Sequence, residues 1–153
     1  MNTVEELKKT IRSIMKSQLF GVLTTLGESW PHSTIITFYA ADDLKSIVFF
    51  TSRNTRKFEN LLREKKVSLF VDNRTNRLVD LQKTYGIEVK GEARETTSEE
   101  RQRYIKLFLT KYQEMVDFTE SPGNAMIKID VRSFDIVHNF QDVTILEVAD
   151  KKG

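Results

Sequence analysis

The sequence contains no cysteine, which excludes disulfide bridges, thiolate metal ligands and thiol nucleophiles. Its two prolines and six glycines form no low-complexity tract, and neither an internal repeat nor an interdomain linker is visible. No apolar run approaches the roughly 20 residues that a membrane-spanning helix needs, so no membrane partner is expected. The net charge is only +2, which is too small an excess to indicate nucleic-acid binding by itself.

What remains is an ordinary soluble composition, with 39% hydrophobic and 30% charged residues in a chain of 153. This length suits one domain with a real core, so we expect a single domain over residues 1–153. Residues 1–16 form a charged amphipathic pattern that does not match a signal peptide. Together with the lack of cysteine, this favours a cytoplasmic protein.

Hydrophobic periodicity predicts a mainly β, α+β protein with six to eight antiparallel strands and flanking helices. A capping box at Thr3 and Glu6 starts a first helix that ends near Ser17. A second helix is expected over 55–64 and a third from Ser98 through Val116, with a polar loop over 73–82. The expected strands are 19–26, 32–41, 46–51, 67–72, 85–94, 125–131, 133–138 and 143–148, with a bulge or sharp bend at Gly91. Hairpin-like succession predicts a bent sheet or small barrel.

The segment 47–58 carries the strongest functional signal. An apolar strand ends in a turn with hydroxyl side chains, and a helix begins beside Arg56 and Lys57. A helix start has backbone N–H groups without partners and a partial positive charge, so hydroxyls and cations there suit a phosphate group. The alternative is a capped, solvated helix start without a ligand.

Other chemistry is weakly represented. His32 and His138 are far apart with no partner at ligand spacing, so we expect structural or surface histidines and no metal site. No nucleophile elbow, Walker loop or dinucleotide-binding glycine motif is present. The carboxylates at 42–43 and 99–100 fit capping roles. No catalytic residue is therefore assigned, and any reaction is expected to depend on a cofactor.

Cations also gather between Arg53 and Arg77. We interpret them as a solvated basic edge in preference to a polyanion-binding stripe. A nucleic-acid-binding small barrel stays an alternative, although few aromatic residues are interleaved for base stacking.

The segments 31–38, 47–57 and 67–72, in this order, resemble the pyridoxamine 5′-phosphate oxidase-like family of FMN-binding split β-barrels. Segments 21–25 and 89–93 are also similar to that family, and the likeness covers roughly residues 19–95. The resemblance implies a split β-barrel that forms a homodimer with two FMN molecules at the subunit interface. Deazaflavin or haem in place of FMN stays open.

The resemblance also implies a set of cofactor-binding residues. Thr55, Arg56 and Lys57 match the family's phosphate-binding positions. Residues 50–52 match the end of the strand that lies beside the flavin in this family. Residues 33–37 match the strand whose backbone lines the isoalloxazine ring. The full set is Ser33, Thr34, Ile35, Ile36, Thr37, Phe50, Thr51, Ser52, Thr55, Arg56 and Lys57.

Two departures bear on the substrate. Thr34 and Tyr39 stand where the vitamin-forming oxidases have basic residues, and no arginine follows Arg132. We therefore expect an FMN-dependent oxidoreductase with an unknown substrate and not an authentic pyridoxamine phosphate oxidase. A flavin carrier or sensor without turnover is the alternative.

Overall fold

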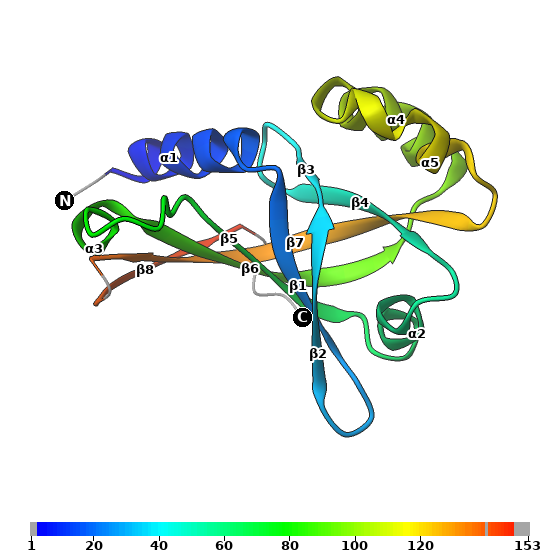
Figure 1. Cartoon of the computed structure of the whole chain (residues 1–153), viewed down its shortest axis with the longest axis horizontal. Coiled ribbons are helices and arrows are strands. Elements are labelled where there is room, and N and C mark those ends of the chain that lie inside the picture. Colours follow the sequence, from blue (N-terminus) through cyan, green and yellow to red (C-terminus); the bar gives the residue numbers. More distant parts are fainter. Residues whose placement is uncertain (1–2, 140, 149–153) are drawn as a thin grey trace.

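A strongly curved antiparallel sheet forms the centre of the computed structural model, which describes residues 3–139 and 141–148 (Figure 1). Its strands are β1 (Phe20–Leu26), β2 (Pro31–Thr37), β3 (Tyr39–Ala40), β4 (Ser46–Ser52), β5 (Lys66–Asp72), β6 (Tyr85–Glu95), β7 (Asn124–His138) and β8 (Asp142–Glu147). The helical elements are α1 (Val4–Ser17), α2 (Arg56–Arg63), α3 (Asp80–Lys83), α4 (Ser98–Lys111), the 3₁₀ turn η1 (Gln113–Met115) and α5 (Val116–Glu120).

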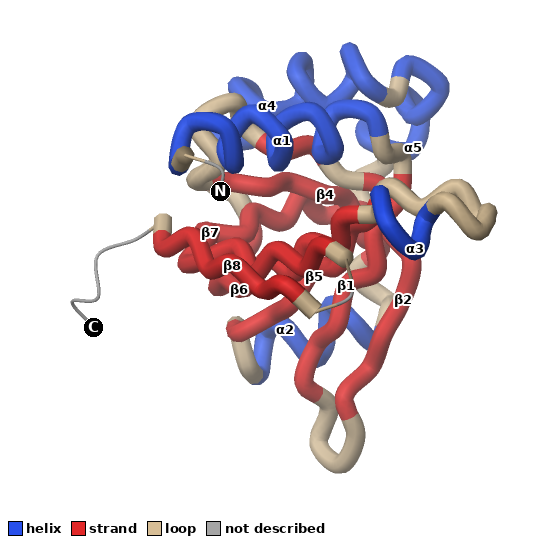
Figure 2. The backbone as a smooth tube through the Cα atoms, turned by 90° about the vertical axis from the view of Figure 1, so that its left-hand side faces the viewer, coloured by secondary structure: helices blue, strands red, loops and turns tan. Residues whose placement is uncertain are grey.

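The strands follow the order β2-β1-β5-β6-β7-β4-β3. The strand β8 pairs with residues 133–138 of β7, beyond the residues of β7 that pair with β4. Because β2 and β3 stand at the two ends of this order, the curled sheet is open between them. Figure 2 shows α1, α4 and α5 together on one side of the strands and α2 on the other. The predicted fold class is confirmed: this is a split β-barrel with flanking helices.

Side chains of β4 enter two separate cores because successive residues of a strand point to opposite faces. Ile47 and Phe49 belong to the large cluster inside the curled sheet. Val48 and Phe50 face the other way and pack with Phe108 and other residues of the helical layer. Burial on both faces explains why this strand is a continuous apolar run in the sequence.

The predicted strand 32–41 is divided in the structure, because Phe38 separates β2 from β3. The hydroxyl of Tyr112 accepts a hydrogen bond from the Phe38 backbone N–H at 3.0 Å and lies 2.8 Å from the Phe38 carbonyl oxygen. A distant side chain thus takes the place of strand pairing at this residue, which local periodicity could not indicate.

The two strands predicted over 125–131 and 133–138 are one strand, β7. The pairing register with β6 shifts between Lys90 and Gly91, so the predicted bulge at Gly91 is confirmed. A Cβ at Gly91 would lie 2.5 Å from the Asp130 carbonyl oxygen. Glycine is needed there for the close approach of the two backbones.

Two predictions, a loop over 73–82 and a helix from Ser98 to Val116, need correction. The loop over 73–82 contains the start of α3, where the Asp80 carboxylate accepts hydrogen bonds from the backbone N–H groups of Thr75 and Asn76 at 2.7 and 2.6 Å. The helix from Ser98 does not continue to Val116, because Tyr112 leaves the helical conformation and η1 and α5 follow separately. None of the described helices has the length and hydrophobicity to span a membrane.

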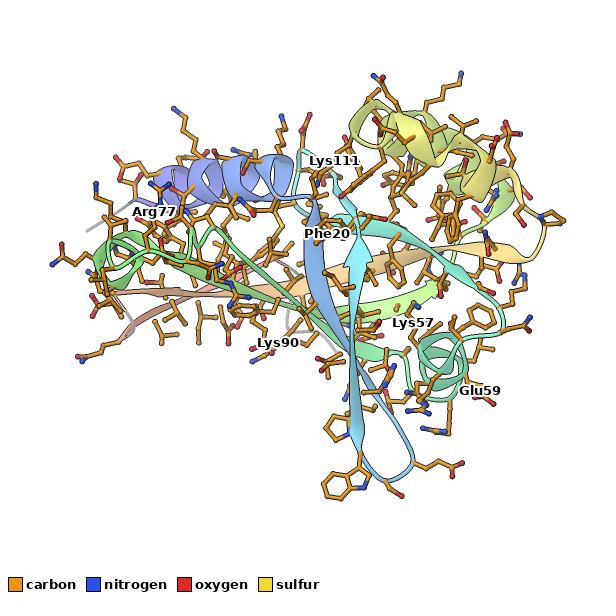
Figure 3. All side chains as sticks on the ribbon, in the orientation of Figure 1. Phe20, Lys57, Glu59, Arg77, Lys90 and Lys111 are labelled. Carbon is orange, nitrogen blue, oxygen red and sulfur yellow. The ribbon has the colours of Figure 1, made fainter. Side chains whose placement is uncertain are left out.

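The outer face of the open end of the sheet exposes apolar side chains. Val22 lies opposite both Ile35 and Phe70 in the strand register, so all three share one face. Ile35 is 65% exposed and Phe20 is 54% exposed. Phe20 is labelled in Figure 3. The outer apolar face consists of Phe20, Val22, Ile35 and Phe70. A cavity of about 470 Å³ lies against it.

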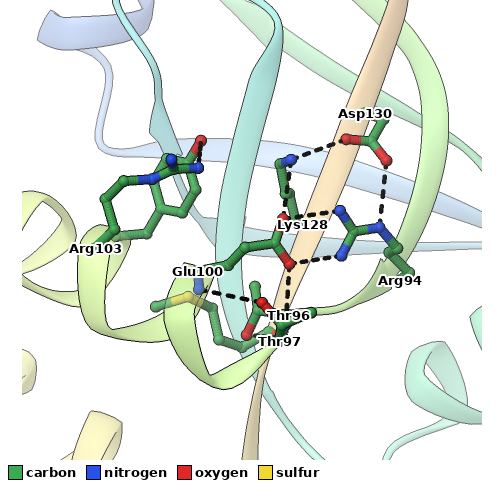
Figure 4. Close-up of polar contacts among 9 residues, drawn as sticks. Arg94, Thr96, Thr97, Glu100, Arg103, Lys128 and Asp130 are labelled. Carbon is green, nitrogen blue, oxygen red and sulfur yellow. Dashed lines mark hydrogen bonds and ion pairs between the residues drawn. The ribbon is translucent and has the colours of Figure 1, made fainter.

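A charged network joins the start of α4 to the sheet (Figure 4). Glu100 forms two hydrogen bonds with Arg94, at 2.7 and 2.8 Å, and an ion pair with Lys128 at 3.1 Å. Its carboxylate also accepts the backbone N–H of Thr97, which completes a capping box. Hydrogen bonds from Arg94 and the other donors hold the pKa of Glu100 well below its usual range.

Replacing Glu100 by glutamine should lower the free energy of unfolding by about 1–3 kcal/mol at neutral pH, because charge-assisted bonds are lost. The folded-state pKa is depressed, so this stabilisation is present above the unfolded pKa of about 4.3 and declines at lower pH. The difference between the two proteins in urea unfolding should therefore shrink as the pH falls below about 4. Glu99→Gln, at an exposed neighbouring position, is the matched control and should change little. An equal loss in both variants would contradict the role of the network.

Candidate phosphate and cofactor site

The start of α2 is organised by hydroxyl groups. The Thr55 hydroxyl caps the helix by accepting the Phe58 N–H at 3.3 Å, and it donates to the Ser52 carbonyl oxygen at 2.9 Å. The Thr51 hydroxyl lies 3.0 Å from that of Thr55, and the Ser52 hydroxyl accepts the Asn54 N–H at 3.3 Å. These bonds fix the turn between β4 and α2 before any ligand binds. We call residues 51–57 the α2 start.

Two backbone donors of the α2 start are free. The N–H groups of Arg56 and Lys57 form no hydrogen bond within the described part of the chain. Because N–H groups in the first turn have no helical acceptor, they point along the helix axis towards a potential anion. The local geometry is that of an anion site.

The cations of this segment divide into paired and unpaired ones. Arg53 forms a two-pronged bond with Glu95, at 2.7 and 2.8 Å, and its guanidinium stacks over the Phe58 ring. Arg56 and Lys57 have no ion pair with any residue that the structure describes. Two unneutralised cations therefore stand beside two free backbone N–H groups.

Lys57 lies on the side of α2 that faces the sheet. It precedes Asn60 and Leu61 by three and four residues, which places them on one helix face. Asn60 donates to the buried Thr25 hydroxyl of β1 at 3.0 Å, and Leu61 is buried. Figure 3 shows Lys57 beside α2 on the side of the β1–β2 hairpin. Partial burial lowers the pKa of Lys57, as expected for an ammonium group that has no anion beside it.

The strand β2 offers a second recognition element. It pairs only with β1 among the described strands, so one row of its backbone N–H and C=O groups is free along its other edge. The strand β4 pairs with β3 only at Ile47 and Val48, which leaves its continuation towards the α2 start open on that side. Figure 1 shows β4 leading towards α2, and α2 contacts β1 on this side.

The predicted lining strand has two different faces. Ser33, Ile35 and Thr37 point outward, and Ser33 lies 2.9 Å from the Thr24 hydroxyl across the strand pair. Thr34 and Ile36 point to the inner face. A planar ligand cannot contact both sets of side chains at once, so a ring beside β2 would meet mainly its backbone edge.

The side chains of several predicted residues are already engaged. Ile36 and Phe50 are buried in the two cores, and Phe50 packs edge-on against Phe108 with ring centroids 5.1 Å apart. Thr51 is 1% exposed, and Thr37 donates to the Met115 sulfur at 3.5 Å. Ile36 and Phe50 can therefore serve a ligand only through their backbone.

One residue near the site did not emerge from the sequence as a candidate. His32 lies opposite Thr25 in the β1–β2 register, and Thr25 bonds to Asn60 of α2. His32 therefore lies on the inner face of β2 together with Thr34. Its strand alternation with Thr34 and Ile36 was the available signal. Among the described residues, no group of three or more metal-ligating side chains is placed to hold a metal ion.

The family model for pyridoxamine 5′-phosphate oxidase matches residues 7–138 of the chain. The chain belongs to the pyridoxamine 5′-phosphate oxidase family. No protein with a curated description matches it significantly.

Several solved structures share this fold. The General Stress Protein 26 of Bacillus anthracis str. Sterne is 23% identical, with a TM-score of 0.70 over 92% of this chain and 98% of that one. A heme binding protein of Mycobacterium smegmatis is 15% identical, with a TM-score of 0.81 over 92% of this chain and 57% of that one. A FAD-binding protein of Mesorhizobium loti is 14% identical, with a TM-score of 0.67 over 88% and 94%.

These relatives hold different cofactors, so likeness of fold does not choose among flavin and haem. Identities below 25% support the shared architecture alone. For this chain, the choice of ligand has to be argued from its own donors at the α2 start and along β2.

Proposed function

We propose that this chain is an FMN-binding flavoprotein that acts as an oxidoreductase on an unidentified substrate. The observation that carries the proposal is the pair of unneutralised cations, Arg56 and Lys57, beside two free N–H groups at the α2 start. A terminal phosphomonoester has the charge and the acceptor oxygens that such a site needs.

In this proposal each part of the site has one task. Arg56, Lys57 and their N–H groups hold the phosphate, and the free edge of β2 supplies backbone donors and acceptors for the polar rim of the ring. Bound FMN would supply hydride or electron transfer, while the protein fixes its position and limits its contact with water. No described side chain is assigned as a general acid or base.

We further propose a homodimer. The outer apolar face of Phe20, Val22, Ile35 and Phe70 is a contiguous, solvent-exposed surface on the open end of the sheet. A second copy of the same face matches it chemically, because two-fold interfaces use one patch on both subunits. One chain of this size covers little of a flavin ring, so the second subunit would complete the pocket.

The proposed substrate is not pyridoxamine phosphate. Thr34 is neutral and lies on the inner face of β2, and the Tyr39 ring packs against the second core cluster near Val48. Neither residue can give a second phosphate the charged donors that would orient it over a flavin. Oxidation of pyridoxamine phosphate at an ordinary turnover of about 1 per second would contradict this part of the proposal.

Haem is less well supported by the described residues. His138 is stacked on Tyr85 at a centroid distance of 4.1 Å, and its Nδ1 is buried. It lies at the opposite end of β7 from the residues that pair with the end of β4. The cations and free N–H groups at the α2 start suit a terminal phosphate, and this supports a phosphorylated cofactor.

The phosphate assignment predicts a difference between FMN and riboflavin. Riboflavin lacks the phosphate and should bind the unaltered protein at least roughly 100-fold more weakly than FMN, because two or more charge-assisted bonds are lost. Quenching of flavin fluorescence gives both dissociation constants under the same conditions. Equal affinity for the two compounds would show that the site does not recognise phosphate.

A further inference from the structure

The segment between β5 and β6 is a folded loop with exposed leucines. We call residues 73–84, which include α3, the α3 loop. Leu78 is 86% exposed and Leu81 is 54% exposed. The Leu81 N–H donates to the Leu78 carbonyl oxygen at 3.1 Å, so one helical turn holds the two side chains three positions apart on the same side. Exposed leucines that share one side of a turn are typical of a contact surface.

The α3 loop is held in shape by its own polar groups. The Asp80 carboxylate accepts the backbone N–H groups of Thr75, Asn76 and Arg77 at 2.7, 2.6 and 3.3 Å. It also accepts the Thr75 hydroxyl at 2.8 Å. Because these bonds fix the loop independently of the leucines, the loop loses less conformational entropy on docking than a mobile segment would.

The α3 loop borders the outer apolar face. Arg74 and Asn76 of the loop line the cavity of about 470 Å³ that lies against Phe20, Ile35 and the rest of that face. Figure 2 shows α3 and β2 on the same side of the molecule. A partner that covers the outer apolar face would therefore lie beside the loop as well.

The outer apolar face alone is too small for a stable interface. Its four side chains are partly covered already, and together they expose on the order of 400 Å², since a phenylalanine side chain buries about 150–250 Å² when fully covered. A stable interface buries about 800 Å² on each partner. The homodimer proposed above therefore needs further surface on this side of the molecule, and the α3 loop offers exposed leucines there.

We propose that the α3 loop is a docking arm for a second copy of this chain, with Leu78 and Leu81 buried against the partner subunit. The inference rests on the proposed homodimer and adds to it a segment outside the outer apolar face. In a two-fold dimer each subunit gives one arm and receives one, so the contact is made twice.

The absence of cysteine lets one introduced thiol report this contact. Leu78→Cys keeps a small apolar side chain at the position, and its rate of reaction with a maleimide is measured at protein concentrations below and above the monomer–dimer transition seen by sedimentation. We expect the thiol to react at least tenfold more slowly in the dimer. Ile145→Cys, at an exposed position on β8, is the matched control and should react at the same rate in both states. Equal rates for the Leu78→Cys thiol in monomer and dimer would overturn the inference and leave the proposed dimer standing.

A second variant measures what the arm contributes to assembly. Leu78→Asp should weaken dimerisation at least tenfold in sedimentation experiments, although it costs the isolated subunit little at so exposed a position. Ile145→Asp should leave the dimer unchanged. A dimer of unaltered affinity in Leu78→Asp would contradict the arm.

The rival partner is an anionic membrane, because the loop also contains Arg77 and Lys83. If Leu78→Asp abolished binding to vesicles of anionic lipid and left dimerisation intact, the loop would be a membrane contact and the inference would be wrong. An unaltered protein that stayed monomeric at every concentration would overturn both the dimer and the arm, whereas titration with FMN tests the flavin site separately.

Discussion

Replacing Lys57 by alanine is expected to weaken FMN binding by roughly 10- to 100-fold, since a well-placed charge-assisted bond is worth about 1.5–3 kcal/mol. Arg56→Ala should have an effect of similar size. Lys57 has no ion pair to lose, and its ammonium is partly buried without a counter-charge. The protein should therefore fold at least as stably without it, and the loss should appear in ligand affinity alone.

The matched control is Arg63→Ala, at the other end of the same helix. Arg63 bonds to the Leu26 carbonyl oxygen at 2.9 Å and lies 3.6 Å from Glu28, so its charge is already engaged. Its removal should leave FMN affinity within about twofold. Riboflavin provides a second control, because Lys57→Ala should not change its affinity if the lysine contacts phosphate. An equal loss for riboflavin and FMN would indicate a structural effect on the helix and contradict the assignment.

Replacing Ile35 by glutamate is expected to convert the proposed dimer into a monomer that no longer retains FMN. Ile35 is the most exposed residue of the outer apolar face, at 65%. The substitution therefore costs an isolated subunit little, but it would bring two like charges together across a two-fold interface. Light scattering should give twice the 17.8 kDa chain mass for the unaltered protein and the single mass for the variant.

The matched control is the same isoleucine-to-glutamate substitution at an exposed position on another strand. Ile145 is 60% exposed and lies on the outer face of β8, opposite Asp135 of β7. Ile145→Glu adds the same charge to a position outside the outer apolar face, and it should leave both the mass and FMN retention unchanged. If the unaltered protein were a monomer that binds FMN, or if only Ile145→Glu dissociated it, the interface model would be wrong.

Local sequence signals were sufficient for most elements of this fold. The capping box at Thr3 and Glu6 placed α1, and alternation with a glycine at 91 placed both β6 and its bulge. The errors arose where contacts with residues far away in the sequence determine where a strand ends or continues. Phe38 leaves the sheet where Tyr112, which is 74 positions away, bonds to its backbone. The continuity of β7 depends on its pairing with β6, β4 and β8 together.

The candidate site likewise has features that the sequence could predict and features that depend on distant residues. The α2 start is a local feature, so the capping hydroxyl of Thr55 and the cations beside it could be identified from their order in the chain. The engagement of Arg53 by Glu95 could not, because 42 residues separate the two partners. Nor could the sequence show that β2 is an edge strand. That depends on the order of strands in the sheet, and the register with β1 places His32 and Thr34 on the inner face.

The most direct test of the account is a calorimetric titration of the purified, cofactor-free protein with FMN. We predict saturable binding of one FMN per chain, with a dissociation constant in the low micromolar range or tighter, about −8 kcal/mol. The absence of detectable binding at tens of micromolar FMN would contradict the central claim that the α2 start of this chain holds the phosphate of a flavin.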